Sequence, residues 1–365
     1  MRNLGLTRRA AAVLCAARAC GLHGVRGRVA RGFVFVVVLA ILGTAAAPAW
    51  ASFPGRNGKI VYQWTGARQS IPTAPRATSI RAVDPRSGRV RVLRICPLRN
   101  NAWRTTFTDC TVGAPRYSPD GQRIAFPTIQ TVLDLTLQPP WQSRPELGTM
   151  AADGSGFEEH ATSNRYWALA WSPAGDRFLV WRELAVPYPR RFAIFLASLD
   201  GTELRQVTPE SAGAVDWSPD WSSTGEIAFI RGRPDPSCFP RCENIWVTRL
   251  GGTPRRLTYR GGYSPSWSPH GTKLAFLRTQ RIRGVYSRDV YIVGRDGRGL
   301  RRLTRRGGFS PCWSPDGQWI AFIRDGDIYV VRTTGRGLRR LVNAPPPEFE
   351  GPFVTSLDWQ PLPRR

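Results

Sequence analysis

The chain has 365 residues and a formal net charge of +26, and nearly all of its basic residues are arginine, since only Lys59 and Lys273 are lysine. It contains no Gly-x-Ser-x-Gly elbow and no base-stacking motif, which argues against an α/β-hydrolase and against a nucleic-acid-binding protein. The arginine excess is consistent with GC-rich codon usage, but a surface of this charge still attracts polyanions over long range.

Residues 1–51 are predicted to be a secretory signal peptide with a long basic leader. Seven arginines and no acidic residue precede the apolar run at 33–47, and Ala49-Trp50-Ala51 offers a small-x-small cleavage site. The run is shorter than the roughly 20 residues of a membrane span, which favours cleavage over an uncleaved anchor and leaves no transmembrane span. Arg8-Arg9 leaves a twin-arginine export signal open, and a wrongly assigned start codon is a separate alternative. Cleavage removes the seven arginines and lowers the charge to +19.

Residues 309–342 hold four short strand candidates separated by three turn signals. The middle two, at 319–323 and 327–331, are β-branched and aromatic runs that are too short for helices. Proline and glycine supply the backbone angles that tight turns need, here at Pro315-Asp316-Gly317, Asp325-Gly326 and Thr334-Gly335-Arg336-Gly337. Four antiparallel strands in roughly 35 to 50 residues is the size of one propeller blade.

The same unit recurs along the chain, and each copy can be followed by an aromatic anchor on its first strand. The anchors are spaced by 54, 46, 50, 46 and 46 residues, at Tyr117, Trp171, Trp217, Trp267, Trp313 and Trp359. Ser-Pro follows the first five, and a second-strand pattern such as Arg123-Ile124-Ala125-Phe126 or Lys273-Leu274-Ala275-Phe276 follows in turn. Repeats in register, each with several matching features, predict a propeller.

This repeat resembles that of the TolB-type β-propellers, relatives of the WD-repeat class, over residues 53–361. The resemblance implies the propeller fold and, more loosely, a partner-binding role in the cell envelope. The recurring residues are turn formers and blade-packing apolar groups, so the motif itself identifies no ligand.

We predict one all-β domain at 52–365, a six-bladed β-propeller of four-stranded antiparallel blades. The blade at 52–94 lacks a first strand, whereas Leu357-Asp358-Trp359 is a first strand with no blade after it. The C-terminal strand is therefore expected to complete the first blade, which closes the ring and removes an open sheet edge.

The long segments between predicted strands, among them 95–114 and 279–288, all fall on the links from strand two to three or from strand four to the next blade. Both kinds of link open on one face of a propeller, so a binding surface is expected there, although loops also vary wherever selection permits. Arginine and aromatic side chains dominate interface hot spots. The candidate binding residues on this face are Trp103, Arg104, Trp141, Arg144, Tyr188, Arg190, Arg241, Arg283 and Tyr286.

The cysteines are expected to form disulfides rather than a metal site. Cys96 and Cys110 flank one long segment and Cys238 and Cys242 lie within another, which in an exported chain indicates two loop-stapling disulfides. Their spacing contains no Cys-x-x-Cys pair, which argues against zinc. Cys312, beside an anchor, is expected to be a buried thiol.

Catalytic constellations are scarce, and we expect no catalytic residue, metal or cofactor. Glu158 and Glu159 are adjacent and would face opposite ways on a strand. The polar residues that precede anchors are candidates for the central channel, namely Arg116, Asp216 and Asp358. A structural role is favoured for them over a catalytic one.

The sequence thus predicts an exported, monomeric, non-enzymatic propeller that binds an envelope protein or an anionic glycan, in the periplasm, in the cell envelope or outside the cell. The alternative is a carbohydrate-active enzyme, a lyase or a hydrolase, with acidic residues at the channel mouth. An open acidic pocket there favours the enzyme, whereas a plugged channel and an arginine–aromatic face favour the binder.

Overall fold

The computed structural model describes residues 53–65, 78–96, 99–100, 106–134, 141–161, 169–184, 191–200, 203–209, 214–233, 243–282, 285–343 and 353–363, all within the compact unit 46–365. The predicted signal peptide lies outside these residues, so its boundary and its cleavage stay predictions. The described residues form strands, turns and loops, and no helix capable of crossing a membrane occurs among them.

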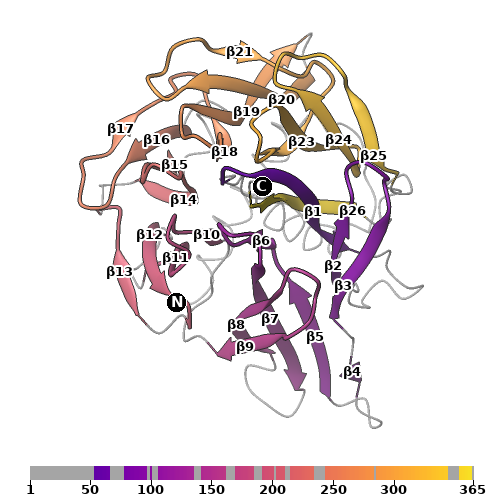
Figure 1. Ribbon diagram of the computed structural model, residues 1–365. Coiled ribbons are helices and arrows are strands. Elements are labelled where there is room, and N and C mark those ends of the chain that lie inside the picture. The colour runs from indigo at the N-terminus through magenta and orange to yellow at the C-terminus, as the bar shows by residue number, and fades with distance from the viewer. Residues whose placement is uncertain are drawn as a thin grey trace, which may run out of the picture. The chain divides into compact units, whose positions relative to one another are not determined.

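Six antiparallel sheets surround a common centre, which confirms the predicted six-bladed propeller (Figure 1). We number the blades 1 to 6 along the chain. From the centre outward, blade 1 contains β26 (Phe353–Leu362), β1 (Arg56–Thr65), β2 (Thr78–Val83) and β3 (Val90–Cys96). Blade 2 contains β6 (Arg116–Tyr117), β7 (Arg123–Asp134), β8 (Trp141–Ala151) and β9 (Glu158–Ala161), with β4 (Arg99–Asn100) and β5 (Thr106–Val112) added beside β7.

The other four blades follow the same order of strands. Blade 3 contains β10 (Leu169–Trp171), β11 (Arg177–Glu183), β12 (Phe192–Ser198) and β13 (Leu204–Gln206), and blade 4 contains β14 (Val215–Trp221), β15 (Ile227–Gly232), β16 (Asn244–Thr248) and β17 (Arg255–Arg256). Blade 5 contains β18 (Tyr263–Trp267), β19 (Lys273–Ile282), β20 (Val285–Gly294) and β21 (Arg301–Arg302), and blade 6 contains β22 (Phe309–Trp313), β23 (Trp319–Arg324), β24 (Asp327–Arg332) and β25 (Arg339–Val342).

The core lies between neighbouring blades, and this explains why the second strands are apolar on both faces. Ile320, Ala321 and Phe322 on β23 are fully buried. One apolar cluster joins Leu277 and Val290 of blade 5 to Phe322 of blade 6. Because each blade covers the face of the next, side chains of both faces interdigitate with a neighbour, as in stacked sheets.

Ring closure follows the prediction, since the C-terminal strand is the innermost strand of blade 1. β26 pairs with β1 antiparallel, with Trp359 opposite Ile60 and Asp358 opposite Val61. The Trp359 indole donates to the carbonyl of Gly58 at 3.1 Å. Blade 1 therefore joins both ends of the described chain in one sheet, which couples them and leaves no open inner edge.

Blade 4 departs from the anchor assigned from sequence. The turn after Trp221, where the Gly225 N–H donates to the Ser222 carbonyl (3.0 Å), repeats the turn after Trp313, where Gly317 donates to Ser314 (2.8 Å). Trp221 lies opposite Ile227 just as Trp313 lies opposite Ile320. The anchor of blade 4 is therefore Trp221, and the assignment to Trp217 is wrong.

Trp217 belongs to a second motif, aromatic-Ser-Pro-x-Trp, which lies upstream of the anchor turn. It occurs at 217–221, 263–267 and 309–313. In each copy the serine has a positive φ, 53° at Ser218, 48° at Ser264 and 46° at Ser310, and the strand pairing shifts across it, as in a β-bulge. Blades 5 and 6 carry Ser-Pro both before and after the anchor, whereas blade 4 keeps only the first pair. The Ser-Pro of blade 4 was therefore aligned with the second pair of the other blades, and Trp217 was taken for the anchor.

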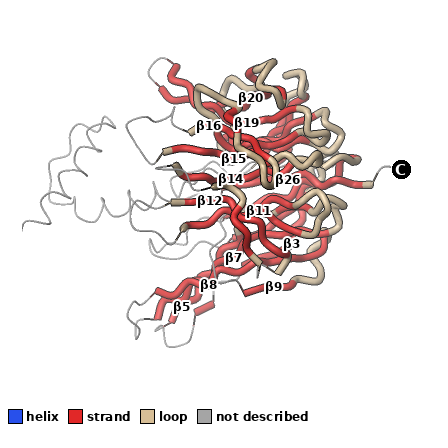
Figure 2. The backbone as a smooth tube through the Cα atoms, turned by 90° about the vertical axis from the view of Figure 1, so that its left-hand side faces the viewer, coloured by secondary structure: helices blue, strands red, loops and turns tan. Residues whose placement is uncertain are grey.

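Blade 2 carries an extension that the sequence analysis treated as a connecting segment. β5 pairs with the far half of β7, from Val112 opposite Thr128 to Thr106 opposite Asp134, whereas β6 pairs with the near half. The residues of β5 are rich in β-branched threonine and valine, which favour a strand. In Figure 2 the strands β5, β7 and β8 project from the ring on the side away from the labelled C-terminus.

The strand order also fixes the two faces of the ring. Tight turns join strands one to two and three to four on one face, which we call the hairpin face. The flanks of the long segments, such as the ends of β15 and β16, lie on the other, which we call the insertion face. β19 and β20 extend onto the insertion face as a paired ribbon whose register runs out to Ile282 opposite Val285.

Candidate functional site

The centre of the ring is filled by the residues that immediately precede the anchors. These six residues are at most 4% exposed, and they are Arg116, Ala170, Asp220, Ser266, Cys312 and Asp358. The predicted channel residues Arg116 and Asp358 are thus placed at the centre. Asp216 lies four residues before Asp220, and both of its carboxylate oxygens accept hydrogen bonds from Arg231 at 2.7 Å. Asp220 holds the place that the sequence analysis gave to Asp216.

The central carboxylates link one blade to the next. Asp358 of blade 1 accepts the backbone N–H of Tyr117 in blade 2 at 2.8 Å, and Asp220 of blade 4 accepts that of Trp267 in blade 5 at 2.6 Å. The buried Cys312 thiol lies 3.5 Å from Asp358 Oδ1. Each carboxylate therefore accepts the backbone N–H of the anchor in the next blade, and this is a structural role.

Burial controls the protonation of this central cluster. It raises the pKa of the Asp358 and Asp220 carboxyls, although the positive charge of Arg116 and the backbone N–H donors oppose the shift. Burial also lowers the pKa of Arg116, against the attraction of Asp358, Cys312 and Asp220. The charge of Arg116 thus acts on both buried carboxyls, and their charges act on Arg116.

An open groove lies instead on the insertion face, between blades 5 and 6. It has a cavity volume of about 620 Å³ and is lined by Thr279, Tyr286, Ser287, Arg288, Arg306, Gly307 and Phe309. No acidic residue is among these described lining residues. Tyr286 and Phe309 are 52% and 41% exposed, and Arg306 is exposed as well.

Strand register explains how this lining arises. Leu277 and Val290 are opposite each other and pack into the core against blade 6. Successive side chains alternate between the faces of a strand, so the next pairs on the same face are Thr279 with Arg288 and then Arg281 with Tyr286. The face that is apolar near the ring centre thus becomes basic and aromatic where the ribbon reaches the insertion face.

The guanidinium group of Arg288 lies beside two aromatic rings. Its central carbon lies 6.0 Å from the centroid of the Tyr263 ring and 5.9 Å from that of Phe309, both within cation–π range. Arg281 lies 5.9 Å from the Tyr286 ring in the same way. None of the described acidic side chains forms an ion pair with Arg288, so its guanidinium donors are available to another group.

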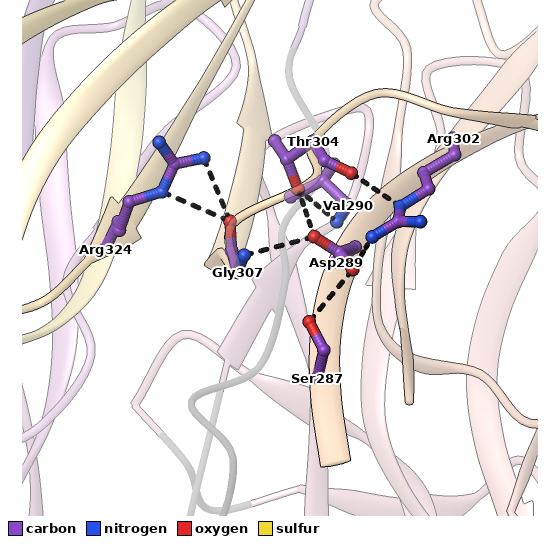
Figure 3. Close-up of polar contacts among 7 residues, drawn as sticks. All are labelled: Ser287, Asp289, Val290, Arg302, Thr304, Gly307 and Arg324. Atoms are coloured by element: carbon purple, nitrogen blue, oxygen red, sulfur yellow. Dashed lines mark hydrogen bonds and ion pairs between the residues drawn. The ribbon is translucent and has the colours of Figure 1, made fainter. Parts of the chain in front are cut away.

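The wall of the groove is held by a hydrogen-bonded network around Asp289 (Figure 3). Asp289 is fully buried and accepts from Ser287 Oγ (3.1 Å), Arg302 Nη2 (2.7 Å), Thr304 Oγ1 (3.2 Å) and the Gly307 N–H (3.1 Å). Thr304 Oγ1 accepts the Val290 N–H at 2.9 Å, and Arg324 donates to the Gly307 carbonyl. This network fixes the link between blades 5 and 6, so the groove is largely pre-formed.

Of the predicted binding residues, Tyr286 lies in this groove. Trp141 and Arg144 lie on β8, and their side chains are outside the described set. The remaining predicted residues lie outside the described residues, and they are Trp103, Arg104, Tyr188, Arg190, Arg241 and Arg283. Arg288 and Thr279 were missed because 279–288 was interpreted as a loop, although the period-two pattern of the hairpin could have placed them. Phe309 was missed because it was interpreted only as the start of a repeat unit.

The predicted disulfides are not tested by the described side chains. Cys96 is buried at the end of β3, and the backbone of Cys110 lies on β5. Cys238 and Cys242 lie outside the described residues, so both pairings stay predictions. Among the described residues, no group of three His, Cys, Asp or Glu side chains is arranged to hold a metal ion.

A second pocket, of about 690 Å³, lies on the hairpin face between blades 3 and 4. Three of its charged side chains, Asp176, Arg177 and Glu203, have polar partners among the described residues. Arg177 lies 3.5 Å from Glu203, and Ser172 donates to Asp176 at 2.7 Å. The groove between blades 5 and 6 differs because its lining residue Arg288 lies beside aromatic rings rather than a carboxylate.

Neither a family model nor a curated protein matches the chain. Among solved structures, TolB from Acinetobacter baumannii is 18% identical, with a TM-score of 0.56, and the match covers 93% of this chain and 74% of that one. Hydrazine synthase from Kuenenia stuttgartiensis is 14% identical, with a TM-score of 0.58, over 86% of this chain and 48% of that one, so this chain spans about half its length. At these identities the likeness shows the fold alone, a β-propeller.

Proposed function

We propose that this protein is an exported, monomeric, TolB-like propeller that acts as a binding module of the cell envelope and holds an envelope protein or an anionic glycan on its insertion face. The groove between blades 5 and 6 carries the proposal. The guanidinium group of Arg288 lies beside the rings of Tyr263 and Phe309, and the exposed Tyr286 and Phe309 line the same groove. Arginine and aromatic side chains in a pre-formed concave surface are the usual anchors of a binding site.

The chemistry of the ring centre supports binding over catalysis. A glycosidase needs two carboxyl groups that flank the scissile bond and reach the substrate. Asp220 and Asp358 are 0% and 2% exposed, and each accepts a backbone N–H of the next blade. Their places in the ring favour the binder over the carbohydrate-active enzyme.

Export is supported by the basic leader and the apolar run at 33–47. A protein outside the cytoplasm meets anionic glycans, lipid headgroups and envelope proteins rather than nucleic acid. The charge of +19 expected after cleavage would accelerate encounters with acidic partners and make them sensitive to salt.

The test is binding of the mature chain, from Ser52, to arrays of neutral and anionic envelope glycans and to purified envelope proteins across a salt series. We expect selective, salt-sensitive binding that falls by about tenfold or more when Tyr286→Ala and Arg288→Ala are combined, because hot-spot truncations cost at least about 2 kcal/mol. Weak binding to every polyanion alike, unchanged in the double variant, would refute the proposal.

A further inference from the structure

We propose that the groove between blades 5 and 6 binds an acidic peptide segment of a protein partner, with Arg288 receiving a carboxylate and Thr279 hydrogen-bonding the peptide beside it. Tyr286 and Phe309 then contact the apolar residues that flank the acid. This inference rests on the proposed function, because it names the ligand class of the same face.

Arg288 is the expected carboxylate contact. Its guanidinium is held near the rings of Tyr263 and Phe309, and none of the described acidic side chains forms an ion pair with it. The adjacent Asp289 points to the other face of β20, where it accepts from Ser287, Arg302, Thr304 and Gly307. A planar guanidinium with unused donors matches the two oxygens of a carboxylate.

Thr279 supplies a second, independent observation. It is 6% exposed and lines the groove, and its Oγ1 has no hydrogen-bond partner in the described part of the chain. A buried hydroxyl left without a hydrogen-bond partner is energetically unfavourable. Thr279 is directly opposite Arg288 in the β19–β20 register, so the two side chains lie on the same face. A ligand that reaches Arg288 therefore passes the unpaired hydroxyl.

The balance of polar and apolar surface favours a peptide over a glycan. Phe309 is 41% exposed and carries no polar atom, so it offers contact area to an aliphatic or aromatic side chain. The Thr279 hydroxyl both donates and accepts, which suits a peptide N–H or C=O. Arg281, Arg305 and Arg306 are exposed around the groove and would attract an acidic segment and repel a basic one.

The experiment is selection of peptides from a random displayed library on the full mature chain, followed by affinity measurements on synthetic copies. We expect the selected peptides to share an Asp or Glu next to an apolar residue. Conversion of that acid to its amide should weaken binding by about tenfold or more, since a hydrogen bond to a charged group is worth about 1.5–3 kcal/mol. Polygalacturonate serves as an anionic glycan with no peptide groups.

The variants separate the site from the overall charge of the protein. Arg288→Ala should abolish the preference for the acid over its amide, Arg288→Lys should restore it in part, and Thr279→Val should weaken both peptides to a similar extent. Arg336→Ala removes one exposed positive charge from a turn on the hairpin face and should leave binding unchanged. Thermal unfolding of each variant confirms that it is folded.

The other outcomes would refute the carboxylate site, the ligand class or the proposed function. If acidic peptides bind no better than their amides, or bind Arg288→Ala as tightly as the original chain, the carboxylate site is overturned. If no peptide is selected but polygalacturonate binds in an Arg288-dependent way, the ligand class is overturned while the proposed binding function survives. If neither binds in an Arg288-dependent way and Tyr286→Ala has no effect on any envelope ligand, both proposals fail.

Discussion

The junction between blades 4 and 5 and the junction between blades 5 and 6 have nearly the same sequence, LTYRGGYSPSW at 257–267 and LTRRGGFSPCW at 303–313. In the first, Tyr263 is 8% exposed and its hydroxyl donates to Glu243 at 2.6 Å. In the second, the equivalent Phe309 is 41% exposed and borders the groove with Arg288. A bridged junction and an open one thus occur in adjacent repeats.

The difference comes from two positions. Glu243 directly precedes Asn244, as Arg288 precedes Asp289, so the bridge between a glutamate and a phenol is replaced by an arginine beside a phenylalanine. The hydrogen bonds that build the two links are shared, because Thr258 and Thr304 both accept a third-strand N–H at 2.9 Å. The repeat preserves the scaffold, and the site arises where the repeat varies.

The largest effect on stability is expected at Asp289, which is charged, whereas the equivalent residue at the junction between blades 4 and 5 is the neutral Asn244. Asp289→Ala should lower the free energy of unfolding by about 3–5 kcal/mol, because it leaves Arg302 without its partner and the Gly307 N–H without an acceptor. Asn244→Ala should cost only about 1–3 kcal/mol, since the hydrogen bonds lost, from Thr258 Oγ1 and the Gly261 N–H, go to a neutral group. Equilibrium denaturation by urea measures both, and equal losses would contradict this ranking.

Grafting the bridge of blade 4 onto blade 5 should close the groove. The double variant Arg288→Glu, Phe309→Tyr recreates the Glu243–Tyr263 pair and reverses the charge of the carboxylate contact. The affinity for acidic peptides should fall by more than about tenfold, because a like charge then faces the ligand. Binding by titration and thermal unfolding are measured together. Retained affinity in a folded variant would show that Arg288 does not receive the acid.

The bridged junction should respond to the loss of its hydroxyl and to alkaline pH. Tyr263→Phe should cost about 1–3 kcal/mol, because it removes a hydrogen bond to a charged group. Burial, with the Glu243 acceptor second, raises the pKa of the Tyr263 phenol. The folded chain therefore keeps this proton where the unfolded chain releases it, so the contribution of Tyr263 is complete below about pH 10 and declines as the pH rises above it.

Denaturation at neutral and alkaline pH isolates this contribution. The difference in stability between the original chain and Tyr263→Phe should shrink above about pH 10, while the variant Phe309→Tyr, whose new phenol is placed at the exposed junction, should show no comparable change. A difference that is constant with pH would contradict the assignment.

The smallest change in stability is expected on substitution of Thr279, in contrast to Thr304 at the same junction. Thr279→Val removes an unpaired hydroxyl and should leave stability unchanged or raise it by up to about 1 kcal/mol, whereas Thr304→Val strips the Val290 N–H of its acceptor and should cost about 1–3 kcal/mol. Thermal unfolding compares the two. A loss on Thr279→Val as large as that on Thr304→Val would mean that the Thr279 hydroxyl is already satisfied.

Part of the candidate site could be predicted from sequence and part could not. Tyr286 was chosen because exposed aromatic residues on the insertion face are good binding anchors, and it lies in the groove. Thr279 and Arg288 were passed over because the pairing of β19 with β20 continues beyond the length of the corresponding pairing in blades 3, 4 and 6. Asp220 was missed because the single Ser-Pro pair of blade 4 can be aligned with either of the two Ser-Pro pairs in blades 5 and 6. Only the strand pairing of Trp221 with Ile227 distinguishes the two alignments.

The six-bladed ring and its closure by the C-terminal strand could be predicted from the sequence, because turn residues and period-two apolar runs are local signals repeated along the chain. The tertiary structure decided which junction is open. That outcome depends on whether the side chain at 243 or 288 meets a phenol from the next blade, and such a contact is set by the register across bulges and by packing between blades.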